Sequence, residues 1–441
     1  MHARSMALRR SFLPRRPGAL ASRLRSEVMG MASEELIAGL DMGSSRVTCL
    51  IGAVDLGGTR VLGGASLPCR GLCGGSVIDI TETKSVIERA LGEAEAAAGG
   101  VTVSGVTLGV RGTRLQSCNG KGAINIARAD REITPEDVQN VLANASAIPL
   151  SPDCEILHVL PQSFTLDHQR GVPNPIGMEG TTLEADVHIV TASSSHLNNL
   201  GKAVSDAGFE VLDTVYSLLA TGPLLVTPEE RDLGALLVDL GGQSVSLGVY
   251  SRGTLRYSKE IGIGSDFITR DLAAGLRASF ATAEELKIAH GVASSRRGGD
   301  KEIEYRRLDG RAIAKARLST MMGYVAPRVE EILDLIAGDL RDSSCADLVG
   351  VGGLILTGGG SLMKGLPAAA RTALRLETRI GMADPERVAG DEKWFSPVYA
   401  TAMGLLTFSS APQGLPGMPR LAQRKTPVWL RRLLSLVKGL L

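Results

Sequence analysis

One local pattern occurs twice in this chain, and it constrains the fold more than any other feature of the sequence. Residues 36–54 are typical of an apolar strand, a tight turn that begins with Asp41, and a second strand. Residues 233–250 repeat the same order, with Asp239 in the position of Asp41. A repeated supersecondary unit indicates an internally duplicated architecture. We therefore expect two related α/β domains, and 441 residues are enough for more than one hydrophobic core.

Both turns contain the residue types that bind phosphate. Residues 41–46 read Asp-Met-Gly-Ser-Ser-Arg, and residues 239–244 read Asp-Leu-Gly-Gly-Gln-Ser. Glycine lets backbone N–H groups approach phosphate oxygens, hydroxyl groups add donors, and a neighbouring aspartate can hold Mg²⁺ through water. Either turn taken alone would fit an ordinary β-hairpin equally well.

A third glycine turn follows the apolar strand that we expect at residues 354–356. Three consecutive glycines, Gly358 to Gly360, would let the backbone pass close to a flat ligand such as adenosine. Three glycine turns that each follow an apolar strand together favour a nucleotide site. The site is not a Walker A loop or a Rossmann fingerprint, because the sequence has no G-x-x-x-x-G-K-S/T motif and no G-x-G-x-x-G motif that opens a helix.

The composition limits the class of ligand and the compartment. The formal net charge is +1 at pH 7 and aromatic residues make up only 3%, so neither a basic field nor a base-stacking surface indicates nucleic acid. The six cysteines form no C-x-x-C pair, which is typical of a protein from a reducing cytoplasm. No run of 18 or more apolar residues is present, so the sequence predicts no membrane-spanning helix.

The two ends of the chain differ in kind from the rest. Residues 1–33 are arginine-rich, which predicts a disordered basic leader or a start assigned too early. Residues 409–425 contain three prolines and are expected to form a linker. Residues 426–441 place apolar and basic side chains on opposite faces of a helix, which favours a helix in a membrane interface over one that docks on the protein's own core. The predicted membrane residues are Trp429, Leu430, Arg431, Arg432, Leu433, Leu434, Leu436, Val437, Lys438, Leu440 and Leu441.

Six further stretches carry a resemblance to a known family. They lie at residues 69–75, 158–162, 174–178, 187–191, 286–291 and 399–406. With the three glycine turns, this ordered series resembles the actin/Hsp70/sugar-kinase ATPase superfamily and, within it, the FtsA family of bacterial cell-division proteins, from about Leu36 to Leu441. The resemblance implies an α/β, actin-like (ribonuclease H-like) two-domain fold with duplicated mixed sheets, an inserted α+β subdomain called 1C and a C-terminal amphipathic helix.

The resemblance also divides the chain into subdomains. It implies that residues 34–110 form the first part of subdomain 1A, that 111–187 form subdomain 1C, and that 188–232 form the second part of 1A with an interdomain helix. Residues 233–408 would form domain 2, with subdomain 2B at about 260–350 and a returning helix at 398–408.

ATP is the implied ligand of the cleft between the two domains, with Mg²⁺ beside it. Asp41 and Asp239 are implied as the catalytic residues and, through water, as the ligands of Mg²⁺. The residues implied around the phosphates are Gly43, Ser44, Ser45, Arg46, Gly241, Gly242, Gln243 and Ser244. Glu284 and Lys287 would face the ribose and adenine, although their spacing of three also fits an i,i+3 ion pair. Gly358, Gly359 and Gly360 would close over the adenosine.

The implied function is that of an ATP-binding cell-division protein that polymerises on anionic lipids at the cytoplasmic face of the inner membrane. At the division site this peripheral protein would tether FtsZ filaments through subdomain 2B, and subdomain 1C would serve self-association and contacts with later division proteins. Arg46, Gln243 and Ser246 stand where the family often has lysine, glycine and an acid, which favours weak or no ATPase activity. The alternatives are a soluble small-molecule kinase of the same superfamily, a pilus- or chaperone-type relative, and a scaffold that uses nucleotide only for structure.

Overall fold

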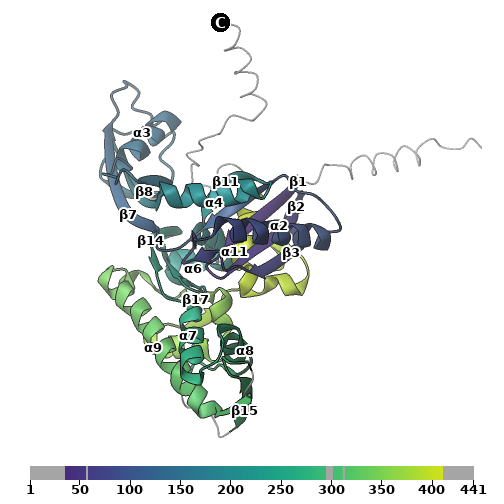
Figure 1. The fold of residues 1–441 in the computed structure, drawn as a ribbon. Coiled ribbons are helices and arrows are strands. Elements are labelled where there is room, and N and C mark those ends of the chain that lie inside the picture. Colours follow the sequence, from purple (N-terminus) through teal and green to yellow (C-terminus); the bar gives the residue numbers. More distant parts are fainter. Residues whose placement is uncertain (1–34, 56–57, 295–300, 311–312, 411–441) are drawn as a thin grey trace, which may run out of the picture.

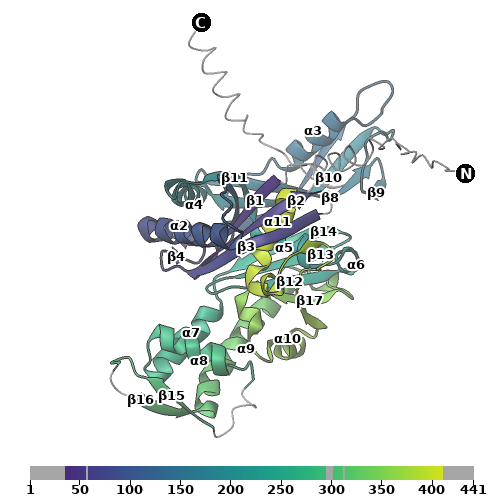
Figure 2. The same cartoon turned by 90° about the vertical axis from the view of Figure 1, so that its right-hand side faces the viewer.

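The computed structural model describes residues 35–55, 58–294, 301–310 and 313–410 (Figure 1). The predicted basic leader, almost all of the predicted linker and the predicted membrane helix at 426–441 lie outside the described residues. The described chain forms two α/β domains, and a smaller subdomain is inserted into the first (Figures 1 and 2).

Each domain is built around one mixed sheet, and the two sheets have the same strand order. In the first domain, β1 (Glu35–Met42) lies between antiparallel β2 and parallel β6. In the second, β12 (Ala235–Leu240) lies between antiparallel β13 and parallel β17. The other strands of the first sheet are β2 (Arg46–Asp55), β3 (Gly58–Pro68), β6 (Gly105–Val110), β11 (Glu210–Tyr216) and β19 (Val388–Ala389). The other strands of the second sheet are β13 (Val245–Ser251), β14 (Thr254–Ile261), β17 (Gly353–Thr357) and β18 (Thr378–Ile380). The order β3-β2-β1-β6-β11 matches β14-β13-β12-β17-β18, which confirms the predicted duplication.

Two helices, α5 (Ser217–Leu225) and α11 (Ala400–Ser410), pack against each other between the sheets. Their buried side chains share one core with the first sheet and with Leu237 and Ile355 of the second. Because side chains alternate along a strand, Leu236 and Val238 point to the other face and form a separate core. The outer faces are covered by α2 (Ile80–Ala97) and α4 (Ser194–Asp206) on the first sheet, and by α7 (Ser265–Leu276), α9 (Leu318–Asp342) and α10 (Leu366–Leu374) on the second (Figure 2).

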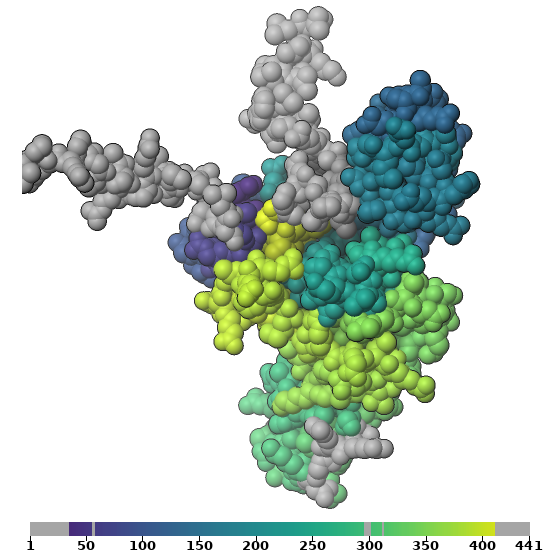
Figure 3. Space-filling view, turned by 180° about the vertical axis from the view of Figure 1, so that it is seen from behind, coloured from purple at the N-terminus to yellow at the C-terminus, as the bar shows by residue number. Residues whose placement is uncertain are grey.

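The inserted subdomain has its own sheet and its own core. The sheet has the order β7 (Leu115–Asn125), β10 (Thr182–Ser193), β8 (Cys154–Leu166) and β9 (Gln169–Val172), and α3 (Pro135–Ala145) packs on it. The subdomain protrudes from the rest of the molecule in Figure 3. Its base meets the second domain, where Ser117 Oγ donates to Ser258 O at 2.6 Å. The boundary expected at residue 187 falls inside β10, which stays paired with β7 and β8 beyond that point.

A small lobe at the end of the second domain contains α8 (Phe280–His290) and the hairpin of β15 (Glu302–Arg306) and β16 (Ile313–Arg317) (Figure 1). The remaining short elements are β4 (Leu72–Cys73), β5 (Ser76–Val77), α6 (Pro228–Leu233), η2 (Ala346–Leu348), η3 (Gly359–Leu362), η4 (Glu392–Phe395) and η5 (Pro397–Tyr399). Among the described residues, no helix is long and apolar enough to cross a bilayer.

The helix expected at 398–408 continues to Ser410, into the first residues of the predicted linker. Hydroxyl contacts hold its last turn, since Ser409 Oγ lies 2.7 Å from Thr107 Oγ1 in β6 and Ser410 Oγ lies 2.9 Å from Thr59 Oγ1 in β3. The end of α11 is thus fixed to the first sheet.

The close packing of α11 on α5 requires a glycine at position 404. A Cβ atom added there would lie 2.5 Å from the carbonyl oxygen of Ala220. We expect Gly404→Ala to lower the free energy of unfolding by about 1–3 kcal/mol in urea titration. The control is Gly92→Ala in α2, where a Cβ meets nothing within 4 Å and alanine should stabilise the helix by up to about 1 kcal/mol. A Gly404→Ala variant as stable as wild type would contradict this packing.

Candidate functional site

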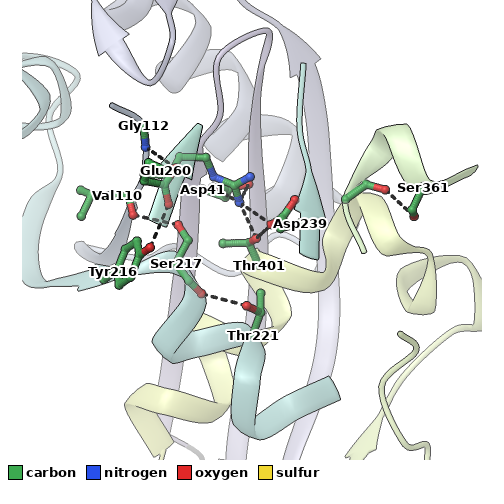
Figure 4. Close-up of polar contacts among 12 residues, drawn as sticks. Asp41, Val110, Gly112, Tyr216, Ser217, Thr221, Asp239, Glu260, Ser361 and Thr401 are labelled. Atoms are coloured by element: carbon green, nitrogen blue, oxygen red, sulfur yellow. Dashed lines mark hydrogen bonds and ion pairs between the residues drawn. The ribbon is translucent and has the colours of Figure 1, made fainter. Parts of the chain in front are cut away.

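The candidate site lies where the first strand of each sheet ends. Asp41 is the penultimate residue of β1, and Asp239 is the penultimate residue of β12. Both side chains are buried, and Figure 4 shows them near Thr401 of α11. Ligands of open α/β sheets bind at the carboxyl ends of the strands, so this is the expected position for a binding cleft.

Arg111, the residue after β6, lies between the two aspartates. Its Nη2 atom is 3.3 Å from Asp41 Oδ1 and 3.1 Å from Asp239 Oδ2. The same nitrogen donates to Thr401 Oγ1 at 2.6 Å. The side chain of Arg111 is only 6% exposed, so its charge is carried in the interior and balanced by carboxylates. Burial lowers the pKa of Arg111, but the charges of Asp239, Asp41 and Glu260 outweigh burial and raise this pKa overall.

Arg111, Thr401 and Glu260 are site residues that the sequence analysis did not find. The family resemblance implies that residue 111 starts the inserted subdomain, whereas its side chain lies between Asp41 and Asp239. A signal was present, because the apolar strand at 105–110 is followed by a charged residue and a glycine. Thr401 lies in one of the stretches that carry the family resemblance.

Glu260 of β14 is a buried acid next to this cluster. It accepts hydrogen bonds from the hydroxyl of Tyr216 and from the backbone nitrogen of Gly112, both at 3.0 Å (Figure 4). Burial raises the pKa of Glu260 to about 7, against the opposing effects of its hydrogen bonds and of Arg111. Burial likewise raises the pKa of Asp41 to about 6, although Arg111 opposes the shift. One guanidinium therefore stands among three buried carboxyl groups.

The two predicted phosphate turns touch each other directly. The backbone nitrogen of Gln243 donates to Ser44 Oγ at 3.0 Å. A Cβ atom placed on Gly242 would lie 2.2 Å from Ser45 Oγ, so this glycine permits the close approach. The side-chain Oε1 of Gln243 accepts hydrogen bonds from Gly74 N and Cys73 Sγ, each at 3.2 Å. Gln243, which occupies the position of an expected glycine, thus binds the second domain to the first.

Several buried polar atoms around these turns have no hydrogen-bond partner among the described residues. They are the hydroxyls of Ser244 and Thr357, Oδ1 of Asp239, Nε of Arg111, and Oδ1 of Asp41, which is ion-paired with Arg111 at 3.3 Å but accepts no hydrogen bond from any described residue. A buried polar group without a partner costs about 1–3 kcal/mol, so a group of them in one place indicates a site for a polar ligand. This set contains both donors and acceptors.

Glu284 and Lys287, which were expected to face ribose and adenine, are paired with each other. Lys287 Nζ lies 2.7 Å from Glu284 Oε2 and donates to Ser265 O at 3.1 Å and Thr269 Oγ1 at 2.8 Å. An ammonium group has three donors, so all of them are engaged. The i,i+3 ion pair therefore forms. The Lys287 side chain is buried, and its hydrogen bonds join α8 to α7. Ser265 N in turn donates to Gly241 O at 2.9 Å, so Lys287 supports the second turn indirectly.

The other predicted ligand residues lie in two places. Gly358 and Gly360 pack against the end of β12, since a Cβ on Gly358 would be 2.2 Å from Asp239 Oδ1 and one on Gly360 would be 2.5 Å from Leu240 Cγ. Gly359 is exposed. Arg46 is directed away from the cleft, and its Nε donates to Ser66 Oγ in β3 at 3.0 Å. The third glycine turn therefore borders the cleft, while Arg46 does not.

Direct coordination of Mg²⁺ by both aspartates, as distinct from the predicted contact through water, does not fit their arrangement here. Mg²⁺ requires oxygen ligands in near-octahedral geometry, and a guanidinium nitrogen already lies within 3.3 Å of both carboxylates. Among the described residues, no group of three or more His, Cys, Asp and Glu side chains could hold a metal ion.

The buried carboxyl of Glu260 makes the free energy of unfolding depend on pH. Its pKa is raised from 4.5 to about 7 in the folded state, so its contribution to stability is complete below about pH 4.5 and is lost as the pH rises through about 7. The glutamine of Glu260→Gln stays neutral at every pH. As the pH rises from about 5 to 8, the free energy of unfolding of this variant should therefore increase relative to that of wild type by about 1–3 kcal/mol. Urea unfolding across this range measures the difference.

The control for this prediction is Glu230→Gln. Glu230 pairs with Arg379 at 2.6 Å, and although burial raises the pKa of Glu230, the hydrogen bonds and charge of Arg379 together with the hydrogen bonds from Thr227 lower it overall. Because this pKa is lowered from its ordinary value, Glu230 stays ionised across the same range, and the difference in the free energy of unfolding between Glu230→Gln and wild type should stay constant. A constant difference for Glu260→Gln as well would contradict the raised pKa of Glu260.

Comparisons with known proteins agree on one family. A family model described as "SHS2 domain inserted in FTSA" matches residues 112–191, and one described as "Cell division protein FtsA" matches residues 236–404. The chain is 35% identical over 379 residues to "Cell division protein FtsA" of Pseudomonas aeruginosa, with 85% of this chain and 89% of the relative covered. It is 31% identical over 414 residues to the protein of the same description from Escherichia coli, with 91% and 97% covered.

A solved structure supports the fold. The chain is similar to a chain of the "PilM-PilN type IV pilus biogenesis complex", with a TM-score of 0.63, 18% identity, and 85% of this chain and 99% of that chain covered. This similarity concerns the fold alone. The duplicated sheets agree with this fold, and the family models and the sequence relatives show that the chain belongs to the FtsA family of actin-like bacterial cell-division proteins.

Proposed function

We propose that this chain binds ATP between its two domains, polymerises on the inner membrane and tethers FtsZ filaments there. The observation that carries the nucleotide part is the meeting of the two glycine turns, with Gln243 N bonded to Ser44 Oγ at 3.0 Å. Successive backbone N–H groups in such turns form concavities that bind anions. The buried hydroxyl of Ser244, which has no partner among the described residues, adds an unused donor beside them.

The groups present fit a nucleotide better than they fit a metal. The residues that would hold its phosphates are Gly43, Ser44, Ser45, Gly241, Gly242 and Ser244, with Gly358 to Gly360 beside the adenosine. The turns would separate to admit the phosphates, because Gly242 leaves no room beside Ser45 Oγ in this arrangement. Binding would therefore be coupled to the relative position of the two domains. The predicted Mg²⁺ is not part of this proposal, because Arg111 already pairs with Asp41 and Asp239.

Weak or absent hydrolysis fits the same contacts. Asp41 and Asp239 would be the candidate bases for activating a water molecule, but both pair with Arg111 within 3.3 Å. Ser246, in place of an acid, carries no charge. In this proposal, nucleotide acts mainly as a structural ligand that sets domain closure and so favours polymerisation.

The membrane and partner roles follow from the sequence and the family. Residues 426–441 separate leucines from basic residues, and each cation near an anionic leaflet adds about 1 kcal/mol of attraction. FtsZ would bind subdomain 2B, at about 260–350, and the inserted subdomain would serve self-association and later division proteins. The protein would act as a peripheral protein on the cytoplasmic face of the inner membrane at the division site.

Adding a side chain where the two turns meet should weaken nucleotide binding. A Cβ on Gly242 would lie 2.2 Å from Ser45 Oγ and 2.9 Å from Asp266 Oδ1, which are the surroundings proposed for the phosphates. Gly242→Ala should weaken ATP binding at least about tenfold in equilibrium dialysis. The control is Gly201→Ala in α4, where a Cβ meets nothing within 4 Å and affinity should not change. Equal ATP affinity in both variants would show that the nucleotide does not bind at the turns.

The tether is tested by co-sedimentation with anionic vesicles and FtsZ filaments, with and without ATP. Full-length protein should bring FtsZ down with the vesicles. Deletion of 426–441, or glutamate at Leu433 and Leu436, should reduce lipid binding at least about tenfold, because each buried CH₂ contributes about 0.8 kcal/mol. The control is Ser435→Ala on the polar face, which should bind as wild type does. Vesicle binding without the helix, or no recruitment of FtsZ with any nucleotide, would refute the tether.

A further inference from the structure

The cleft contains a positive charge that belongs to the protein. Arg111 Nη2 lies within 3.3 Å of a carboxylate oxygen from each domain, and Thr401 Oγ1 accepts a hydrogen bond from it at 2.6 Å. An arginine side chain stays charged at every pH at which the protein is folded. Its partners come from β1, β12 and α11, so three separate elements hold the guanidinium in place.

The duplicated fold shows what is unusual about this position. Asp41 is level with Gly109 across β1 and β6, and Asp239 is level with Thr357 across β12 and β17. Two residues beyond each of these partners lie Arg111 in the first domain and Gly359 in the second. Gly359 is exposed and places no side chain at its position. The buried arginine fills the other side with a cation.

A divalent ion would compete with this guanidinium for the same oxygen atoms. To coordinate Asp41 and Asp239, Mg²⁺ would have to displace a permanently charged group that lies between them. Arg111 would then be buried without its ion pairs to Asp41 and Asp239, which is strongly destabilising. Since Arg111 neutralises the carboxylates already, the electrostatic attraction for a second cation is also reduced.

We propose that Arg111 is the resident cation of this cleft: it holds Asp41 and Asp239 in place of a divalent ion, so that the chain binds a nucleoside triphosphate without Mg²⁺. The inference rests on the proposed nucleotide binding. Nε of the guanidinium is a buried donor without a hydrogen bond among the described residues, so a ligand oxygen that reached it would satisfy it. Nη1 lies 3.7 Å from the position that a Cβ of Gly241 would take, beside the second phosphate turn. Arginine donors of this kind are well suited to phosphate oxygens.

The first test uses Mg²⁺ alone, without nucleotide. The Tm of the full-length wild-type protein should be the same in EDTA and in saturating MgCl₂. Arg111→Gln leaves two buried carboxylates unpaired, so its Tm should fall in EDTA and recover by at least about 3 °C in MgCl₂. The control is Arg379→Gln, which removes an arginine from Glu230 at 2.6 Å outside the cleft. It should lose stability without any response to Mg²⁺.

The second test uses ATP as the probe. Wild-type affinity in EDTA should stay within about threefold of the affinity in MgCl₂, whereas Arg111→Gln should lose at least about tenfold when Mg²⁺ is removed. Two wild-type results each overturn the proposal, even if Arg111→Gln does not fold in EDTA. They are a rise in Tm with Mg²⁺ alone and a loss of ATP affinity of about tenfold or more in EDTA. If ATP binds under neither condition, the proposed nucleotide binding fails, while the Mg²⁺ experiment still decides the role of Arg111.

Discussion

The ion pairs of Arg111 with Asp41 and Asp239 join the two halves of this molecule at their centre. The guanidinium lies 3.3 Å and 3.1 Å from carboxylates that end the first strands of two different sheets. A buried ion cluster adds little net stability, but removing one member leaves uncompensated charges and is strongly destabilising. The relative position of the two sheets is therefore tied to this contact. Helix α11 takes part through Thr401, and Gly404 one turn later lets the same helix approach α5 closely.

The glycine turns depend on that arrangement. Because β1 and β12 end at the same cluster, the turns that follow them meet, and Gln243 N reaches Ser44 Oγ. The contact leaves buried polar atoms of Ser244 and Thr357 without partners among the described residues. Such groups are stabilised when a polar ligand satisfies them. A ligand that enters between the turns would exchange contacts between domains for contacts with itself, which couples its binding to the domain arrangement.

Features encoded over a few neighbouring residues could be predicted from the sequence. The repeated strand, turn and strand led to the two sheets, and the turns at Asp41 and Asp239 do meet in one cleft. Contacts over long sequence separation could not be predicted, because residues 41, 111, 239 and 401 become neighbours only after the sheets and α11 have packed. Lys287 illustrates the opposite difficulty. Its spacing from Glu284 was consistent with both a ligand pair and an ion pair, and only the fold shows that its three donors are engaged within the protein.

The duplication also explains how one cleft acquired two unlike sides. Both sheets supply an aspartate from their first strand, and each places a neighbouring parallel strand beside it. Had both halves kept a glycine turn after that strand, two buried carboxylates would face each other and would require a cation from solution. Had both carried an arginine, the guanidinium groups would repel each other and no opening would remain for a flat ligand. With Arg111 on one side and Gly359 on the other, the carboxylates are neutralised from within, and the second domain places no side chain at the matching position.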